Sequence, residues 1–457
     1  MGSWVEQELC TLELNDARRE RRLKRIVDRL ASQPSLSIPR ACADKAEMNA
    51  TYYAWNSPHV TPEAILAAHR DATVERLSSL PVVLVATDTT NIDLTTHESV
   101  EGLGHLDNKT RFGLKVHSAV AISPEGGFLG TLHQHVWARD PQALGQFKER
   151  RKRDLSEKES QRWLDTLDAV QQVIPESTVG VLVGDREADI YGLFAHPREA
   201  HMELLVRSAW NRRTENGYLH DRVRAELPCG KLTITVPRSE KRAERTAVLT
   251  LRYAKVSILP PKNLVSKMGK QGVEVWIVLA EEETPADGVK DPVSWLLLTT
   301  LPMNNSADAA QCVAYYTRRW LIERFHYVLK SGCGVEKLQL HSIDALETAL
   351  ATYDVVAWRL LNLTLHARLT PEAPCSVVFE QAEWEALCVR STKKSIPPKK
   401  PPTLHEAVRM IAKLGGFLGR KSDGEPGVKT IWQGLVALHE VVETYTAMRG
   451  IPSPRLC

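Results

Sequence analysis

The N-terminal part of the chain carries apolar side chains at helical spacing. In the stretch 15–32 they recur every three or four residues, and Asn15 or Asp16 is placed to cap a helix. The apolar stripe consists of Leu23, Ile26, Val27 and Leu30. We expect two further helices, over about 41–55 and from Thr61-Pro62, because proline favours the first helical position. This pattern predicts a small helical N-terminal domain, residues 1–72.

From residue 81 onward, short apolar runs replace the helical spacing. PVVLVA predicts a buried strand that ends in Thr87-Asp88-Thr89-Thr90, and VGVLV (179–183) predicts another that ends in Gly184-Asp185-Arg186-Glu187. Between them, GLKVHSAVAI and FLGTLHQHVW flank the turn Ser-Pro-Glu-Gly-Gly and predict a hairpin. Residues 214–302 hold further strand-like runs without a long helical period. We interpret them as a β-rich insertion in a central α/β domain, residues 73–372.

The C-terminal part returns to helical spacing. The chain is expected to be mostly helical from 331 to about 390, and STKKSIPPKKPP (391–402) has the composition of an extended linker. Thr403 and Glu406 predict a capping box at the start of the next helix, and Ser156 and Glu159 predict another earlier in the chain. A last helix is expected over about 430–448. Residues 373–457 therefore read as a helical interaction domain.

The stretch 313–330, VAYYTRRWLIERFHYVLK, has the most unusual polar face in the chain. It contains no Gly or Pro, which predicts one helix of about five turns. At roughly 100° per residue, five polar side chains fall within an arc of about 80°. They are Tyr316, Arg319, Glu323, His326 and Lys330, whereas Leu321, Phe325 and Val328 lie on the opposite side. An acid, cations, a phenol and an imidazole on one face suit a metal ion and a phosphate together.

Composition narrows the class of protein only a little. The chain has 457 residues, of which 43% are hydrophobic, and a formal net charge of +3, so it can form a large core and is not globally basic. It has no apolar run of about 18 residues, no signal-peptide core and no Gly-rich nucleotide-binding loop, and its scattered cysteines favour reduced thiols in the cytosol. Charge is concentrated locally, because six cations crowd residues 18–25. This segment predicts either a solvated face or a nucleic-acid contact.

Three carboxylates on separate elements indicate a metal site. Asp88 and Asp185 each follow a predicted buried strand, and Glu323 lies on the polar face of the predicted 313–330 helix. Oxygen ligands suit Mg²⁺, and two such ions can activate a water or a 3′-hydroxyl for phosphoryl displacement. An aspartate after a strand is more often only a cap, so the combination carries the hypothesis. We interpret His117, His133 and His135 as strand-face residues, and His326 as an auxiliary phosphate or metal contact.

These motifs together resemble the IS-four family of bacterial DDE transposases. The spacing Y-x2-R-x3-E-x6-K is filled by Tyr316, Arg319, Glu323 and Lys330. The other matching segments, in chain order, are LNDARRERRL, ATDTT at 86–90, GDREADIYG at 184–192, SWLLLTTLP at 294–302 and AKLGGFLG at 412–419. The resemblance covers nearly the whole chain. It implies an RNase H-like catalytic core with a β-rich insertion, flanked by an N-terminal DNA-binding domain and a C-terminal dimerisation domain.

The resemblance also implies a mechanism and residue roles. Asp88, Asp185 and Glu323 would hold two Mg²⁺ or Mn²⁺ ions for nicking, hairpin formation and opening, and strand transfer. The implied contacts to double-stranded DNA are Tyr316, Arg319, Lys330, Trp295, Arg207, His326, Arg18, Arg19 and Arg22. Trp295 would receive a flipped base. The protein would act as a homodimer in the cytoplasm of a bacterium, associated with the nucleoid, and each subunit would cut the end that its partner binds.

Departures from the family pattern leave alternatives open. The loop 139–155 is longer and more basic than the family pattern, and Tyr327 stands where a lysine is expected. A nuclease that cleaves without joining is one alternative. A DNA-binding inhibitor of transposition is another, although the intact carboxylate triad argues against it.

Overall fold

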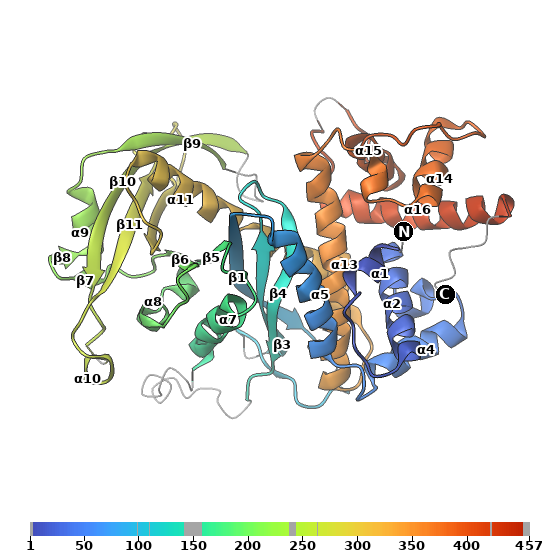
Figure 1. Cartoon of the computed structure of the whole chain (residues 1–457), viewed down its shortest axis with the longest axis horizontal. Coiled ribbons are helices and arrows are strands. Elements are labelled where there is room, and N and C mark those ends of the chain that lie inside the picture. Colours follow the sequence, from blue (N-terminus) through green and yellow to red (C-terminus); the bar gives the residue numbers. More distant parts are fainter. Residues whose placement is uncertain are drawn as a thin grey trace. The chain divides into compact units, whose positions relative to one another are not determined.

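The computed structural model describes residues 3–97, 99–108, 110–140, 158–236, 244–262, 264–420 and 423–450. The chain forms two compact units. The helical unit comprises Met1–Ser79, Thr89–Gln146 and Leu321–Cys457, and the sheet unit comprises Leu80–Asp88 and Phe147–Trp320. Figure 1 shows the elements of both units in the colours of their sequence positions. The basic segment KERRKR (148–153) and Ser156 of one predicted capping box lie outside the described residues.

The N-terminal helices of the helical unit follow their capping signals. They are α1 (Trp4–Glu8), α2 (Ala17–Ser32), α3 (Ile38–Ala41), α4 (Lys45–Trp55) and α5 (Pro62–Leu77). The Asp16 carboxylate accepts from the Arg18 N–H at the start of α2, and Thr61 caps α5. The predicted helices are therefore confirmed, except that the second begins at Lys45, after the separate short helix α3.

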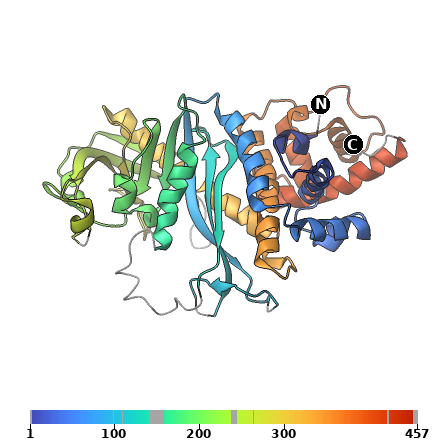
Figure 2. The same cartoon turned by 60° about the horizontal axis from the view of Figure 1, so that its bottom comes forward.

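The long helix α13 (Ile343–Leu369) is the centre of the helical unit. It is apolar around most of its circumference, as expected of a helix enclosed by neighbours, and most of its residues are buried. It packs against α2, α4, α5, α15 (Leu404–Leu414) and α16 (Val428–Met448). Figures 1 and 2 both show α5 beside it. With α14 (Gln381–Thr392), these elements confirm the predicted C-terminal helices and the Thr403–Glu406 capping box.

A predicted hairpin completes the helical unit. Strands β3 (Phe112–Ile122) and β4 (Phe128–Trp137) pair antiparallel, β2 (Gly104–His105) pairs with β3, and β4 packs on α5 and α13. His117 lies opposite His135, and Ala119 lies opposite His133. His117 is fully buried and bonds through Nδ1 to the Thr89 hydroxyl, at 2.8 Å. The three histidines therefore sit on strands, as predicted.

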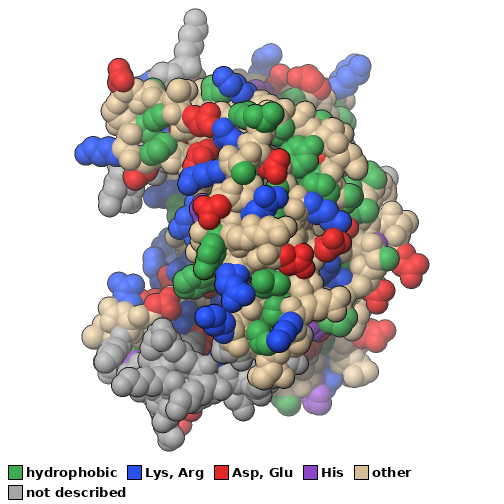
Figure 3. All heavy atoms as spheres, turned by 90° about the vertical axis from the view of Figure 1, so that its left-hand side faces the viewer, with side chains coloured by type: hydrophobic (Ala, Val, Ile, Leu, Met, Phe, Trp, Pro, Cys, Tyr) green, Lys and Arg blue, Asp and Glu red, His purple; other side chains and the backbone are tan. Residues whose placement is uncertain are grey.

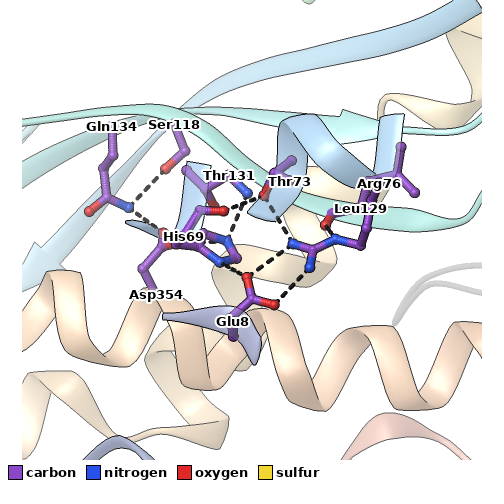
Figure 4. Close-up of polar contacts among 9 residues, drawn as sticks. All are labelled: Glu8, His69, Thr73, Arg76, Ser118, Leu129, Thr131, Gln134 and Asp354. Atoms are coloured by element: carbon purple, nitrogen blue, oxygen red, sulfur yellow. Dashed lines mark hydrogen bonds and ion pairs between the residues drawn. The ribbon is translucent and has the colours of Figure 1, made fainter. Parts of the chain in front are cut away.

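A buried polar network joins elements of the helical unit that lie far apart in sequence. The Glu8 carboxylate contacts His69 Nδ1 at 2.5 Å and accepts two hydrogen bonds from Arg76. The Thr131 N–H donates to His69 Nε2, so His69 carries its proton on Nδ1, facing Glu8. Asp354 of α13 accepts from Gln134 at 2.7 Å. Figure 4 shows these side chains converging from α1, α5, β4 and α13.

The sheet unit is built on three parallel strands. Strand β1 (Val82–Asp93) pairs with β5 (Val179–Gly184), and β5 pairs with β6 (Met202–Arg207). The helices α7 (Arg162–Gln171) and α8 (Tyr191–Ala195) lie in the connections. The strand was predicted to end in the run Thr87-Asp88-Thr89-Thr90, but β1 continues through that run to Asp93, and Thr89 onward belongs to the helical unit. The polar residues Thr89, Thr90 and Asn91 led to the wrong prediction, because this part of the strand is only half-buried and therefore lacks an apolar sequence.

The predicted β-rich insertion is present. It contains β7 (Arg213–Thr214), β8 (Gly217–Tyr218), β9 (Gly230–Val236), β10 (Arg245–Ile258), β11 (Val273–Glu281) and β12 (Ser294–Thr299), with the short helices α9 (Leu219–Arg224) and α10 (Val265–Met268). Its last strand, β12, pairs antiparallel with β6. The insertion therefore extends the sheet of the parallel strands rather than forming a separate layer.

The single helix predicted over 313–330 is wrong. The structure has α11 (Ser306–Arg318), a turn at Arg319-Trp320, α12 (Leu321–Tyr327) and the π-helical turn η5 (Val328–Gly332). Each half has its own packing partners, since α11 contacts β6, β10 and β11 whereas α12 contacts α13. Packing therefore ends the helix where no Gly or Pro would. Leu321, Phe325 and Val328 are buried, as predicted.

Among the described residues, no helix combines the length and the apolar character that crossing a membrane requires.

Candidate active site

Adjacent parallel strands of the sheet unit align three predicted site residues. Ala86 pairs with Val183, and Val183 pairs with Leu205. Asp88, Asp185 and Arg207 each follow one of these three paired residues by two positions, with Asp185 directly after the end of β5, and we call these three positions the strand row. Neighbouring strands lie about 4.8 Å apart, and positions in one row point to the same face. The sheet therefore presents two carboxylates and a guanidinium side by side at the carboxyl ends of its parallel strands.

A tight turn holds Asp185 at the end of β5. The chain enters the 3₁₀ turn η4 (Arg186–Ala188), where the Asp185 carboxylate accepts from the Glu187 N–H at 2.8 Å. A Cβ on Gly184 would lie 2.4 Å from the Ala188 Cβ, so only glycine lets the turn fold back onto the strand. The Thr87 hydroxyl donates to the Val183 carbonyl at 3.1 Å and holds β1 against β5. Asp185 is thus a cap residue as well as a candidate ligand.

Cationic and aromatic side chains of the sheet unit lie next to Asp88. The Arg319 guanidinium is 3.7 Å from the Asp88 carboxylate, and both side chains are largely buried. The same guanidinium lies 6.0 Å from the centre of the Tyr316 ring, which contacts the Trp295 ring edge-on at 5.5 Å. Arg207 donates to the carbonyl of Ser294, the residue before Trp295. Five of the predicted site residues of this unit therefore form one connected group.

Glu323 and Lys330 lie in the helical unit. Glu323 is exposed on α12. The Lys330 ammonium pairs with Glu336 at 3.2 Å, and Glu336 in turn accepts from the Asp93 N–H. The Thr95 hydroxyl, which donates to Asp93, holds the pKa of that carboxyl below its usual value. Lys330 thus has an acidic neighbour that the sequence did not reveal.

His326 is turned into the protein. It is only 5% exposed, and its Nε2 lies 3.4 Å from the Ser118 hydroxyl of β3. A buried ring does not offer its nitrogens to a phosphate, which argues against the direct contact predicted for it. The next residue, Tyr327, is exposed, and its ring lies 5.8 Å from Trp432 of α16. The residue that replaces an expected lysine therefore contacts the C-terminal helix.

The basic run on α2 divides into exposed and structural cations. Arg18 and Arg22 are exposed. Arg19 is half-buried and donates to the Leu14 carbonyl, and Lys24 pairs with Glu6 at 2.7 Å with its side chain only 14% exposed. The exposed cations are the ones available to a ligand.

The donor set of the strand row suits a hard divalent cation, because Asp88 and Asp185 offer carboxylate oxygens and nothing softer. Within the described part of the chain, no group of three or more His, Cys, Asp or Glu side chains is arranged to hold a metal ion. The strand row therefore supplies two candidate ligands.

Three family models match the chain. A transposase DNA-binding model matches residues 1–60, a transposase DDE domain matches 153–358, and the Tn5 transposase dimerisation domain matches 355–451. The chain belongs to the Tn5-like DDE transposases. This confirms the predicted family and the fold class, a helical N-terminal domain, an α/β core with a mixed sheet, and a helical C-terminal region. The DDE match contains Asp185 and Glu323 and begins after Asp88.

The family defines the activity in outline. The protein is a DDE-type DNA nuclease and strand transferase that depends on divalent metal. Its DNA-binding and dimerisation domains identify DNA and a second copy of the chain as partners.

Several cations in the described part of the insertion of this transposase are paired with acids. Figure 3 shows Lys and Arg mixed with Asp and Glu over the face that it views. Arg224 pairs with Glu281 at 2.8 Å, and Lys255 pairs with Glu274 at 3.1 Å. This mixture contrasts with α2, whose exposed arginines gather on one short helix.

The sequence analysis gave no role to Asp189, the last acid of the GDREAD segment (184–189). Asp189 is buried and binds Arg212 and the backbone of residues 209 and 210. An available signal was the spacing of two acids four residues apart, of which only the first was assigned. Arg162, which pairs with Glu187 at 2.8 Å, was also missed.

Proposed function

We propose that the protein carries out cut-and-paste DNA transposition. Water attacks a phosphodiester at the transposon end and releases a 3′-hydroxyl. That hydroxyl attacks the opposite strand to form a hairpin, a second water reopens the hairpin, and the 3′-hydroxyl finally displaces a 3′-oxygen in target DNA. The proposal is supported above all by the alignment of Asp88 and Asp185 on adjacent strands, next to Arg319.

Asp88, Asp185 and Glu323 are the proposed ligands of two Mg²⁺ ions, which Mn²⁺ can replace. Bound metal would lower the pKa of the attacking water and stabilise the leaving oxygen. The aspartates are held by strand register and by the η4 turn, so their carboxylates need little rearrangement. Glu323 would reach the ions from α12, where its side chain is exposed.

The proposed DNA contacts fall into two groups. Tyr316, Arg319, Arg207 and Lys330 would hold phosphates near the cleaved bond, with Trp295 against a flipped base. Arg18 and Arg22, which are exposed, would bind phosphates of the transposon end and make affinity fall with salt, and half-buried Arg19 would support them from its bond to the Leu14 carbonyl. His326 would act only indirectly, since its ring is buried. Each subunit of the dimer would cut the end bound by its partner.

Cleavage and joining can be tested separately. The substrate is an inverted repeat taken from DNA that flanks the gene, either intact or pre-cut, with a plasmid as target and Mg²⁺ present. The proposal expects cleavage and joining by the wild type and loss of both in Asp185→Asn and Glu323→Gln. Asp168→Asn is a matched control, because Asp168 is a half-exposed acid of the same sheet unit that pairs with His196.

Two outcomes would contradict this proposal. A wild type that cleaves but never joins a pre-cut end would be a nuclease. A wild type that binds the ends without cleaving them would be an inhibitor of transposition.

We also propose that the borders between the three domains lie near residues 72 and 372, and that the protein works on the nucleoid of a bacterial cytoplasm.

A further inference from the structure

The buried carboxylate of Asp189 has no part in the proposed chemistry. Its side chain is fully buried and forms a close ion pair with Arg212, whose Nε and Nη2 both lie within 2.8 Å of Asp189 Oδ1. The other oxygen, Oδ2, accepts from the Ala209 N–H at 2.7 Å and from the Trp210 N–H at 3.2 Å. A buried charge with this many donors is fully satisfied, and it fixes whatever backbone supplies them.

The backbone that Asp189 fixes is the loop 208–212, directly after β6. The Ser208 hydroxyl lies 3.2 Å from Asp189 Oδ2 and 2.9 Å from the Trp210 carbonyl, which adds a second tie within the loop. Despite this rigid backbone, the Trp210 side chain projects outward and the residue is 66% exposed. An exposed indole on a backbone that Asp189 holds in place is available to stack against a flat partner.

The loop begins beside the candidate metal ligands. Arg207, one position before it, lies in the strand row next to Asp185 by the register of β5 and β6. Asp189 itself follows Asp185 by a single 3₁₀ turn, in which the Ala188 N–H donates to the Asp185 carbonyl. The same short turn therefore presents Asp185 and anchors the loop of Trp210. Exposed Arg186 and Arg213 lie at the two ends of this arrangement.

We propose that Trp210 is a DNA contact that stacks on a base close to the cleaved phosphodiester. An indole face binds any base, neighbouring arginines bind phosphates, and a backbone fixed before binding lowers the entropic cost. This inference rests on the proposed function, since it places the DNA at the carboxyl ends of the parallel strands. The base belongs either to the transposon end or to target DNA, which share this chemistry.

Four variants test the role of the indole. Trp210→Ala should weaken the DNA step that uses it by about tenfold or more, and Trp210→Phe should retain most of that step, because stacking survives with a smaller ring. Asp189→Asn should give an intermediate defect by loosening the loop. Tyr218→Ala is the matched control, since Tyr218 is an exposed aromatic of the same unit at 46% exposure. It should behave as wild type.

Two assays identify the source of the base. Loss of end binding and end cleavage by Trp210→Ala assigns the base to the transposon end. Normal cleavage with defective joining of a pre-cut end to plasmid assigns it to the target. DNA should also quench the tryptophan fluorescence of the wild type more than that of Trp210→Ala, because the other tryptophans are the same in both proteins.

Failure of this inference is distinguishable from failure of the proposed function. If the wild type cleaves and joins DNA, and Trp210→Ala matches it in both assays, only the role of Trp210 is refuted. If Trp210→Ala shifts the dimer to monomer in sedimentation while single-end binding is unchanged, the indole contacts protein and the inference is also refuted. A wild type without cleavage refutes the proposed function itself.

Discussion

At the scale of single residues, the least predictable feature is the buried acid of α13. Asp354 is fully buried, and loss of solvent raises the pKa of its carboxyl from 3.8 to about 6. Its neighbours are His69 of α5, Thr131 and Gln134 of β4, and Cys333 beyond η5. The sequence shows an acid in an apolar helix but cannot show that His69, Thr131 and Gln134, all at least 220 positions away, lie against it.

Replacing Asp354 with Asn should change how stability depends on pH. Because folding raises this pKa, the neutral acid is favoured in the native state, and its contribution is complete below pH 3.8 and is lost as pH rises through about 6. Relative to the wild type, the Asn variant should gain about 3 kcal/mol in free energy of unfolding across that window. Urea denaturation at several pH values measures it, and a stability difference that does not vary with pH would contradict it.

Arg319→Ala should impair cleavage far more than stability. The guanidinium lies 3.7 Å from the Asp88 carboxylate and would hold a phosphate there, so its loss should slow end cleavage by about 10-fold to 100-fold, the effect of losing one charged contact to the DNA. The free energy of unfolding should fall by only about 1 kcal/mol. Cleavage rates and thermal melts test both expectations.

Arg252→Ala is the matched control for Arg319→Ala. Arg252 is equally buried, at 15% against 14%, and pairs with Glu283 at 2.8 Å in the insertion. The Arg252→Ala variant should lose about as much free energy of unfolding as Arg319→Ala and should cleave DNA at the wild-type rate. Equal melting loss in both variants with unchanged cleavage in Arg319→Ala would remove Arg319 from the site.

At the scale of elements, the sequence predicted which helices and strands exist, whereas packing between elements sets where several of them end. The helices with capping signals, such as α2 and α5, begin where their caps predict. The break at Arg319-Trp320 carries no such signal, because residues 313–330 are good helix formers throughout. The single polar helix face predicted over that stretch is therefore only approximate, although Tyr316 and Arg319 do lie next to each other, as predicted.

Gly184→Ala should disturb the turn that presents Asp185. The added methyl would lie 2.4 Å from the Ala188 Cβ, which belongs to the turn and cannot rotate away. We expect a loss of about 1–3 kcal/mol in free energy of unfolding and a large fall in Mg²⁺-dependent cleavage. Denaturation and cleavage rates give the two numbers.

Gly230→Ala controls for the general effect of adding a methyl group. A Cβ on Gly230 would meet its nearest neighbour at 3.9 Å, so the site has room. Its stability should stay within about 1 kcal/mol of wild type. If Gly184→Ala cleaves as well as Gly230→Ala, the turn does not position Asp185.

At the scale of the whole molecule, the sequence predicted the order of the regions along the chain but not which segments pack together into the compact units. The order of helical, α/β and helical regions is confirmed by the family models. The compact units, however, are not consecutive, since the helical unit takes three separate segments. Periodicity describes neighbours in sequence, and nothing in it tells that α2 and α13 share a core.

DNA affinity should depend on salt through the exposed cations of α2. Each phosphate contact contributes about one unit to the slope of log affinity against log salt, so Arg18→Ala combined with Arg22→Ala should lower the slope by about two. Lys24→Ala is the control, because the Lys24 side chain is only 14% exposed and pairs with Glu6, whereas the Arg18 side chain is 84% exposed. Binding titrations from about 50 to 200 mM salt measure the slope, and an unchanged slope in the double variant would contradict binding of the transposon end by α2.

The central position of α13 also has a consequence for synthesis. Helix α2 ends at Ser32 and packs on α13, which begins at Ile343, so about 310 residues are translated between them. At roughly 5–20 residues per second, the apolar stripe of α2 waits about 15–60 s for its partner. During that time α2, whose Leu23, Ile26 and Leu30 are buried in the finished protein, lacks its contact with α13. The N-terminal helices of a nascent chain are therefore exposed to chaperones and proteases until the ribosome has almost finished.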